Sequence, residues 1–221
     1  DGIYDKNSLK KWLRLTSIKH EMDFYDMMYN FIQKLKRELD LNNVQLANYL
    51  AKNFNVKISP TIIWGWCGGE FYGRKRGVPI QIIRLLDDFH FKLTNKNYNL
   101  YKKLYDYADI VISMSSHRLK LVKTINKDLA YLLGIIVGDG SCSNTFVDKN
   151  RKYKNYRVHV SSSYKYHINK LVEKFYNVFG AKVSPKYDKK NHIWRIDFKS
   201  KYIFTLLTKI FEIPVGKKSK I

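Results

Sequence analysis

The chain has 221 residues, of which 41 are lysine or arginine and 19 are aspartate or glutamate, so its formal net charge at pH 7 is +22. Because repulsion on this scale opposes folding, it predicts a polyanionic partner such as nucleic acid, although a lysine-rich solvated surface has the same composition. Cys67 and Cys142 have no closely spaced histidines, which argues against a zinc site and a disulfide framework. The longest apolar run is far shorter than the ~20 residues that cross a bilayer, so we expect an intracellular, cytoplasmic protein of prokaryotic type without membrane contact.

The amino-terminal half has the pattern of helices. Apolar residues recur every three or four positions over residues 22–39 and again over 46–54. Ser59 followed by Pro60 is typical of a helix start and predicts a short helix over 61–66. Further helices are predicted from Pro79 onward and over 98–108. A serine-rich connector over 109–123 follows, so we expect an all-helical domain over residues 1–120.

The carboxy-terminal half mixes helix and strand patterns. Helices are predicted over 127–137, 168–178 and 203–210, and Gly180 is placed to end the second of them. Alternating apolar and polar residues predict strands around 157–161, 182–187 and 193–199. Residues 121–221 are therefore expected to form an α+β domain in the order αββαββα.

The helix over 127–137 ends in an unusual way. Ala130, Gly134 and Gly138 lie four residues apart, on one face of the helix, and small residues there allow a second helix backbone to approach closely. Asp139 follows at the carboxyl end, where the helix dipole disfavours an anion unless a cation compensates it. Two such helices side by side would bring two carboxylates together at a divalent-metal site. The alternatives are an Asp-Gly turn and close packing within the core.

The stretch from Leu132 to Gly140 resembles the nine-position signature of the LAGLIDADG homing endonucleases. The positions that match it are Leu132, Gly134, Gly138, Asp139 and Gly140, those with conservative variants are Leu133, Ile135 and Ile136, and Val137 replaces an acidic residue. The αββαββα order and the tail Ile213–Ser219 also resemble a repeat of this family, so the resemblance extends over about residues 123–221.

The resemblance implies a four-stranded antiparallel sheet and a Mg²⁺-dependent site for phosphodiester hydrolysis, in which Mn²⁺ can replace Mg²⁺. Asp139, with the adjoining Gly138, would hold the metal, and Lys217 and Lys218 would lie near the attacking water or the phosphate. Ser162 occupies a position where a polar, water-positioning side chain is common. The face formed by Ala130, Gly134 and Gly138 would pack against the equivalent helix of a second copy.

Two surfaces are candidates for DNA binding. One face of the sheet is predicted to carry Arg157, His159, Ser161, Lys182, Lys186, Arg195 and Lys199. Arg195 is the best candidate for a bidentate guanine contact. A shift of one residue in the strand assignment would exchange the two faces of the sheet. The alternative to DNA binding is a solvated sheet face. The stretch 44–66 is typical of a helix-turn-helix, although any compact helical bundle has a similar pattern. Its exposed candidates, with those of the basic loop that follows, are Thr61, Trp64, Arg74, Lys75 and Arg76.

These features together predict a site-specific double-stranded DNA endonuclease of the kind that mobilises introns and inteins. The alternative is a DNA-binding protein without cleavage activity, such as a transcriptional regulator or an intron maturase. Only one copy of the signature is present, whereas the paired carboxylates require two. We therefore expect either a homodimer or a second repeat in a longer chain.

Overall fold

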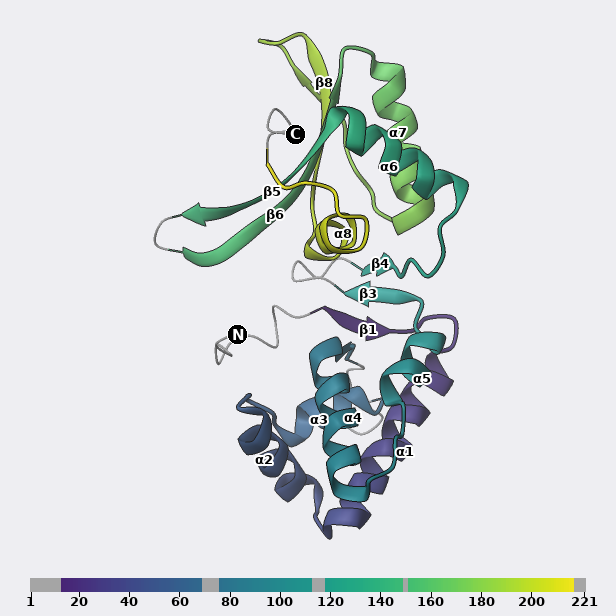
Figure 1. Ribbon diagram of the computed structural model, residues 1–221, viewed down its shortest axis with the longest axis vertical. Coiled ribbons are helices and arrows are strands. Elements are labelled where there is room, and N and C mark those ends of the chain that lie inside the picture. Colours follow the sequence, from purple (N-terminus) through teal and green to yellow (C-terminus); the bar gives the residue numbers. More distant parts are fainter. Residues whose placement is uncertain (1–12, 69–75, 113–117, 149–150, 217–221) are drawn as a thin grey trace. The chain divides into compact units, whose positions relative to one another are not determined.

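The computed structural model describes residues 13–68, 76–112, 118–148 and 151–216, with side chains described except over 145–154. The chain divides into two compact units, residues 1–117 and 118–221. Both contain helices and strands, so the fold is of the α+β class (Figure 1).

The first unit consists of helices and short strands. The helices are α1 (Glu21–Leu39), α2 (Asn43–Phe54), α3 (Pro60–Trp66), α4 (Ile80–Thr94) and α5 (Leu100–Tyr107), and the strands are β1 (Arg14–Thr16), β2 (Val78–Pro79) and β3 (Ile110–Ile112). Strand β1 pairs antiparallel with both β2 and β3. The prediction of an all-helical domain is therefore wrong. Strands this short show no periodicity in the sequence, but buried Leu15, Val78 and Val111 need backbone partners once water is excluded.

Side-chain caps begin two of these helices. The Asn42 side chain accepts hydrogen bonds from the backbone N–H groups of Val44 and Gln45, and the Gln45 side chain accepts one from the Asn42 N–H, which completes a capping box at α2. The Ser59 hydroxyl accepts from the Ile62 N–H at 3.4 Å, and Pro60 occupies the first turn of α3. The helix start predicted at Ser59–Pro60 is present.

The second unit has the predicted order of elements. After β4 (Arg118–Lys120) come α6 (Lys127–Asp139), β5 (Gly140–Asp148), β6 (Arg151–Ser162), α7 (Lys165–Phe179), β7 (Lys186–Asp188), β8 (Ile193–Lys199), α8 (Lys201–Thr205) and a π-helical turn η2 (Leu206–Ile210). Strands β5, β6, β8 and β7 lie in that order in an antiparallel sheet. The strand predicted over 182–187 begins only at Lys186. Strand β7 is an edge strand, and its pairing with β8 starts where Lys186 lies opposite Arg195. The alternation over 181–184 reflects burial of Ala181 and Val183 without strand pairing.

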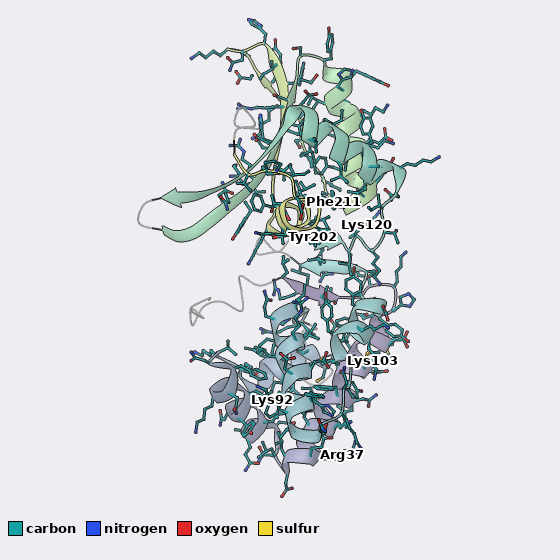
Figure 2. All side chains as sticks on the ribbon, viewed as in Figure 1. Arg37, Lys92, Lys103, Lys120, Tyr202 and Phe211 are labelled. Atoms are coloured by element: carbon teal, nitrogen blue, oxygen red, sulfur yellow. The ribbon has the colours of Figure 1, made fainter. Side chains whose placement is uncertain are left out.

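The start of the second unit is held by contacts to its later elements. The Lys120 ammonium group donates a hydrogen bond to the Asn177 carbonyl oxygen at 3.2 Å, and the Val122 N–H donates one to the Tyr202 hydroxyl at 2.8 Å (Figure 2). Residues 118–120 therefore belong to this unit rather than to the amino-terminal one, in which the sequence analysis placed them.

One face of the sheet forms the core with the helices. Helices α6 and α7 lie on the same side of the sheet in Figure 1. Val158 and Val160 of β6, with Ile196 and Phe198 of β8, are buried beneath them, and the rings of Phe175 and Phe198 lie 6.0 Å apart. Asp128 of α6 pairs with Lys174 of α7 at 2.9 Å, so the start of α6 lies beside the end of α7. The opposite face of the sheet is polar.

Candidate nucleic-acid interface

The polar face of the sheet is built from residues that alternate with the core residues. Directly opposite residues of an antiparallel sheet point to the same side. The rows are Ser143, Arg157 and Lys199; Ser141, His159 and Asp197; and Ser161, Arg195 and Lys186. All the predicted DNA-contact residues of the sheet share this face except Lys182, which is exposed but lies outside the strands. Their role in DNA binding stays a prediction.

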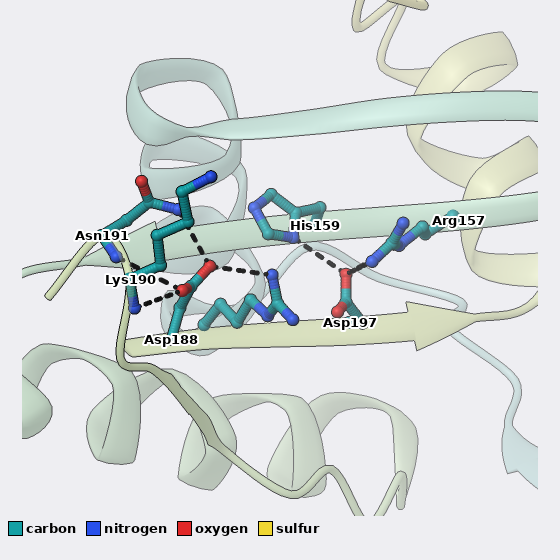
Figure 3. Close-up of polar contacts among 7 residues, drawn as sticks. Arg157, His159, Asp188, Lys190, Asn191 and Asp197 are labelled. Carbon is teal, nitrogen blue, oxygen red and sulfur yellow. Dashed lines mark hydrogen bonds and ion pairs between the residues drawn. The ribbon is translucent and has the colours of Figure 1, made fainter. Parts of the chain in front are cut away.

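Asp197 is the centre of one polar cluster on this face. Its Oδ1 accepts a hydrogen bond from Arg157 Nε at 2.7 Å and contacts Arg157 Nη2, and His159 Nδ1 lies 2.8 Å from the same oxygen (Figure 3). Burial acts to raise the pKa of Asp197, but the hydrogen bonds from His159 and Arg157 outweigh it, so the pKa is lowered overall. Asp197 is therefore a carboxylate that holds an arginine and a histidine together.

Asp188 forms a second cluster at the turn between β7 and β8. Its Oδ2 accepts from Asn191 Nδ2 at 3.1 Å and from Arg195 Nη1 at 3.3 Å, and its Oδ1 accepts from the Lys190 N–H (Figure 3). The hydrogen bond from the Asn191 side chain contributes most to lowering the pKa of Asp188. Arg195 Nε is buried and has no hydrogen-bond partner among the described residues. Arg195 is thus anchored at one end of its guanidinium group.

The sequence reasoning missed the two carboxylates that hold the arginines of this face. Asp197 alternates with Arg195 and Lys199, so the strand pattern already placed it on the polar face. The pairing with Arg157 joins residues 40 positions apart, which no local pattern reports.

The small-residue stripe of α6 is uncovered within the described chain. Ala130, Gly134 and Gly138 are exposed, and a Cβ added at either glycine would meet nothing within 4 Å. At Gly140, by contrast, an added Cβ would lie 2.8 Å from Ile136 Cα. The glycines of the stripe are therefore not required by packing inside this unit, whereas Gly140 is. Packing of the stripe against a second helix stays a prediction.

Asp139 lies at the end of this stripe, where it is exposed. No group of three or more His, Cys, Asp or Glu side chains that could hold a metal ion occurs among the described residues. Mg²⁺ is usually held by one or two carboxylates, with water and phosphate oxygens as the remaining ligands. An exposed carboxylate at a helix end thus fits half of a shared magnesium site and does not form a complete site alone.

The tail after η2 runs beside β5. Ile213 is buried, Val215 forms a parallel bridge with Cys142, and the Gly216 N–H donates a hydrogen bond to the Cys142 carbonyl oxygen at 2.9 Å. Cys142 is only three residues from Asp139 along the chain. Lys217 and Lys218 lie outside the described residues, so their proposed position near the phosphate is untested.

The candidate residues of the first unit are distributed differently. Thr61 and Arg76 are exposed, Trp64 is half-buried, and Trp66 belongs to the core. Arg74 and Lys75 lie outside the described residues. Helix α3 follows α2 after a short turn, but its use as a recognition helix stays a prediction.

No helix in the described part of the chain is long and apolar enough to cross a membrane.

A solved structure, but no family model or curated protein, is similar to this chain. Among solved structures, a "LAGLIDADG homing endonuclease I-GzeII in complex with DNA target" aligns with 16% sequence identity and a TM-score of 0.28 over 89% of this chain. The chain spans 54% of the length of that one. At this TM-score, the similarity does not assign a fold family.

Proposed function

We propose that this protein binds double-stranded DNA through the polar face of the β5–β6–β8–β7 sheet and that Asp139 contributes half of a metal-dependent site for phosphodiester hydrolysis. The observation that carries the proposal is the segregation of the sheet. Its covered face is apolar, while its open face presents Arg157, Arg195, Lys186 and Lys199. A nuclease of the homing type would need such a face to recognise one long target.

The sheet is suited to contact the edges of base pairs. The major groove of B-DNA admits a β-ribbon, and arginine makes bidentate hydrogen bonds to guanine O6 and N7. The side chains of Arg157 and Arg195 are 41% and 39% exposed, so each is partly accessible although a carboxylate anchors it. The exposed lysines favour phosphate contacts, which add affinity without sequence preference.

The hydrolytic site requires two α6 helices. Exposed Gly134 and Gly138 allow the backbone of a second α6 to approach, which would bring a second carboxylate beside Asp139. Asp139, with Gly138 adjoining it, would hold the metal, and Lys217 and Lys218 would stabilise charge on the phosphate. When bound there, Mg²⁺, or Mn²⁺ in its place, would supply Lewis acidity and lower the pKa of a bound water.

The test is to replace Asp139 and to measure cleavage of a DNA target that the wild-type protein has selected. Duplexes selected by the wild type from a randomised pool serve as substrate, with Mg²⁺ or Mn²⁺ present. We expect Asp139→Asn to abolish cleavage of both strands while DNA affinity changes less than about threefold, because a metal ligand is lost and the basic face is intact. Cleavage by Asp139→Asn at the wild-type rate would remove Asp139 from the site.

A second candidate function is sequence-specific DNA binding without cleavage, as in a transcriptional regulator or an intron maturase. It rests on the same basic face of the sheet, which would bind DNA with or without a metal site. This function predicts that the wild type selects a target and leaves it intact with either metal. The same selection and cleavage assay therefore separates the two functions.

A further inference from the structure

Carboxylates are unexpected on a face that meets phosphates. Asp197 and Asp188 lie among the arginines and lysines of the sheet, with side chains only 14% and 17% exposed. A negative charge there opposes binding of a polyanion. Partly exposed ion pairs also contribute little to folding stability. The position of Asp197 therefore calls for an explanation other than affinity or stability.

The contacts of Asp197 restrict the guanidinium group of Arg157. Two nitrogens, Nε and Nη2, contact the same oxygen, Oδ1. These contacts fix the plane of the guanidinium group. Asp197 does not use the N–H groups of Nη1 or the second N–H of Nη2. Two parallel N–H groups are what the O6 and N7 acceptors of guanine require. A lysine, which is a flexible point charge, cannot present this pair.

The same oxygen also orients the His159 ring. Because a carboxylate oxygen only accepts, the 2.8 Å contact with Nδ1 means that Nδ1 carries a hydrogen. The contact therefore holds the imidazole ring beside the guanidinium group of Arg157.

We propose that Asp197 is a positioning residue for base recognition: it holds Arg157 as a donor pair for one guanine in the major groove. This inference rests on the proposed DNA-binding function. It predicts that replacing Asp197 has two opposite effects. Affinity for DNA of any sequence should stay the same or rise, while discrimination between sequences should fall.

The experiment replaces single atoms in the DNA. The full chain first selects duplexes from a randomised pool, and each guanine of the preferred duplex is then replaced in turn by 7-deazaguanine, which lacks the N7 acceptor. For the wild type we expect one position at which replacement weakens binding roughly 5- to 100-fold. In Asp197→Asn that penalty should fall below about threefold, while binding to unselected duplex is unchanged or tighter.

Two further variants show whether Asp197 acts through Arg157. Arg157→Lys keeps the charge but loses the guanidinium group, so it should remove the penalty at the same guanine. The double variant should show no further loss, since the two residues form one unit. Glu173→Gln is the matched control, because it removes one negative charge from an exposed side chain of α7, away from the polar face. It should retain the full penalty.

The outcomes separate the inference from the proposed function. If the wild type selects a duplex and Asp197→Asn shows the same penalty at every guanine, the positioning role is wrong and DNA recognition by the chain stands. If the wild type selects no sequence, the proposed function fails and the inference fails with it. Thermal unfolding of each variant checks the fold, and Asp197→Ser provides the same measurement if Asp197→Asn does not fold.

Discussion

At the scale of single residues, glycine has two different roles around the end of α6. Gly140 has an ordinary extended backbone, with φ −93° and ψ 174°, so its conformation does not require glycine. Its surroundings do, because an added Cβ would be 2.8 Å from Ile136 Cα and 2.9 Å from the Ile136 carbonyl oxygen. Gly134 is exposed in the middle of the helix and meets no such obstacle.

The two glycines predict opposite changes in stability. Gly140→Ala should lower the free energy of unfolding by about 1–3 kcal/mol, because backbone atoms must move to admit the methyl group. Gly134→Ala should raise it by about 0.5–1 kcal/mol, because alanine is the better helix former at an unobstructed position. Urea denaturation of both variants measures the difference. Equal effects would mean that the packing around Gly140 has been misassigned.

At the scale of elements, α6 carries an apolar residue outside the face that it buries against the core. Leu129, Leu132 and Ile136 face the core, yet Val137 is 55% exposed beside Gly138. Exposed apolar residues next to small ones are typical of a helix that packs against another helix. An exposed surface of this kind is suited to packing against another helix, and the proposed function assigns it to a second α6.

This arrangement predicts that Gly138→Leu separates folding from assembly. An added Cβ meets nothing within 4 Å among the described residues, so the free energy of unfolding in urea should change by less than about 1 kcal/mol. Between two α6 helices it would hold the backbones apart, so association and cleavage should be lost together. Sedimentation on the selected duplex, paired with the cleavage assay, measures both.

Glu173→Leu is the control for Gly138→Leu, because it places leucine at an exposed position of the neighbouring helix α7. It should leave assembly and cleavage intact. A Gly138→Leu protein that assembles and cuts like the wild type would show that the small-residue stripe is not the contact.

At the scale of the whole molecule, the net charge of +22 predicts a strong dependence of DNA binding on salt. Each phosphate neutralised releases a counterion, so log K should fall with log salt by roughly 0.9 per phosphate. Titrations on selected and unselected duplexes should have similar slopes, because phosphate contacts are largely independent of sequence. Binding that is insensitive to salt would contradict DNA contact through the lysines and arginines.

The sequence by itself determined what depends on neighbours along the chain. The period of apolar residues located α1, α2 and α7, because helix contacts repeat every three to four residues. Alternation around residues 157–161 and 193–199 placed four residues on one side of their strands, because every second side chain of a strand points to the same side. These residues are Arg157, His159, Arg195 and Lys199.

The tertiary structure alone decided what depends on partners distant in sequence. Strands β1, β2 and β3 are two or three residues long and exist because they pair across the first unit. The start of β7 at Lys186 is decided by its pairing with β8, and the anchoring of Arg157 by a carboxylate 40 residues away. Hydrogen bonds and ion pairs act over a few ångströms in space whatever the separation along the chain, so only the folded arrangement shows which charges meet.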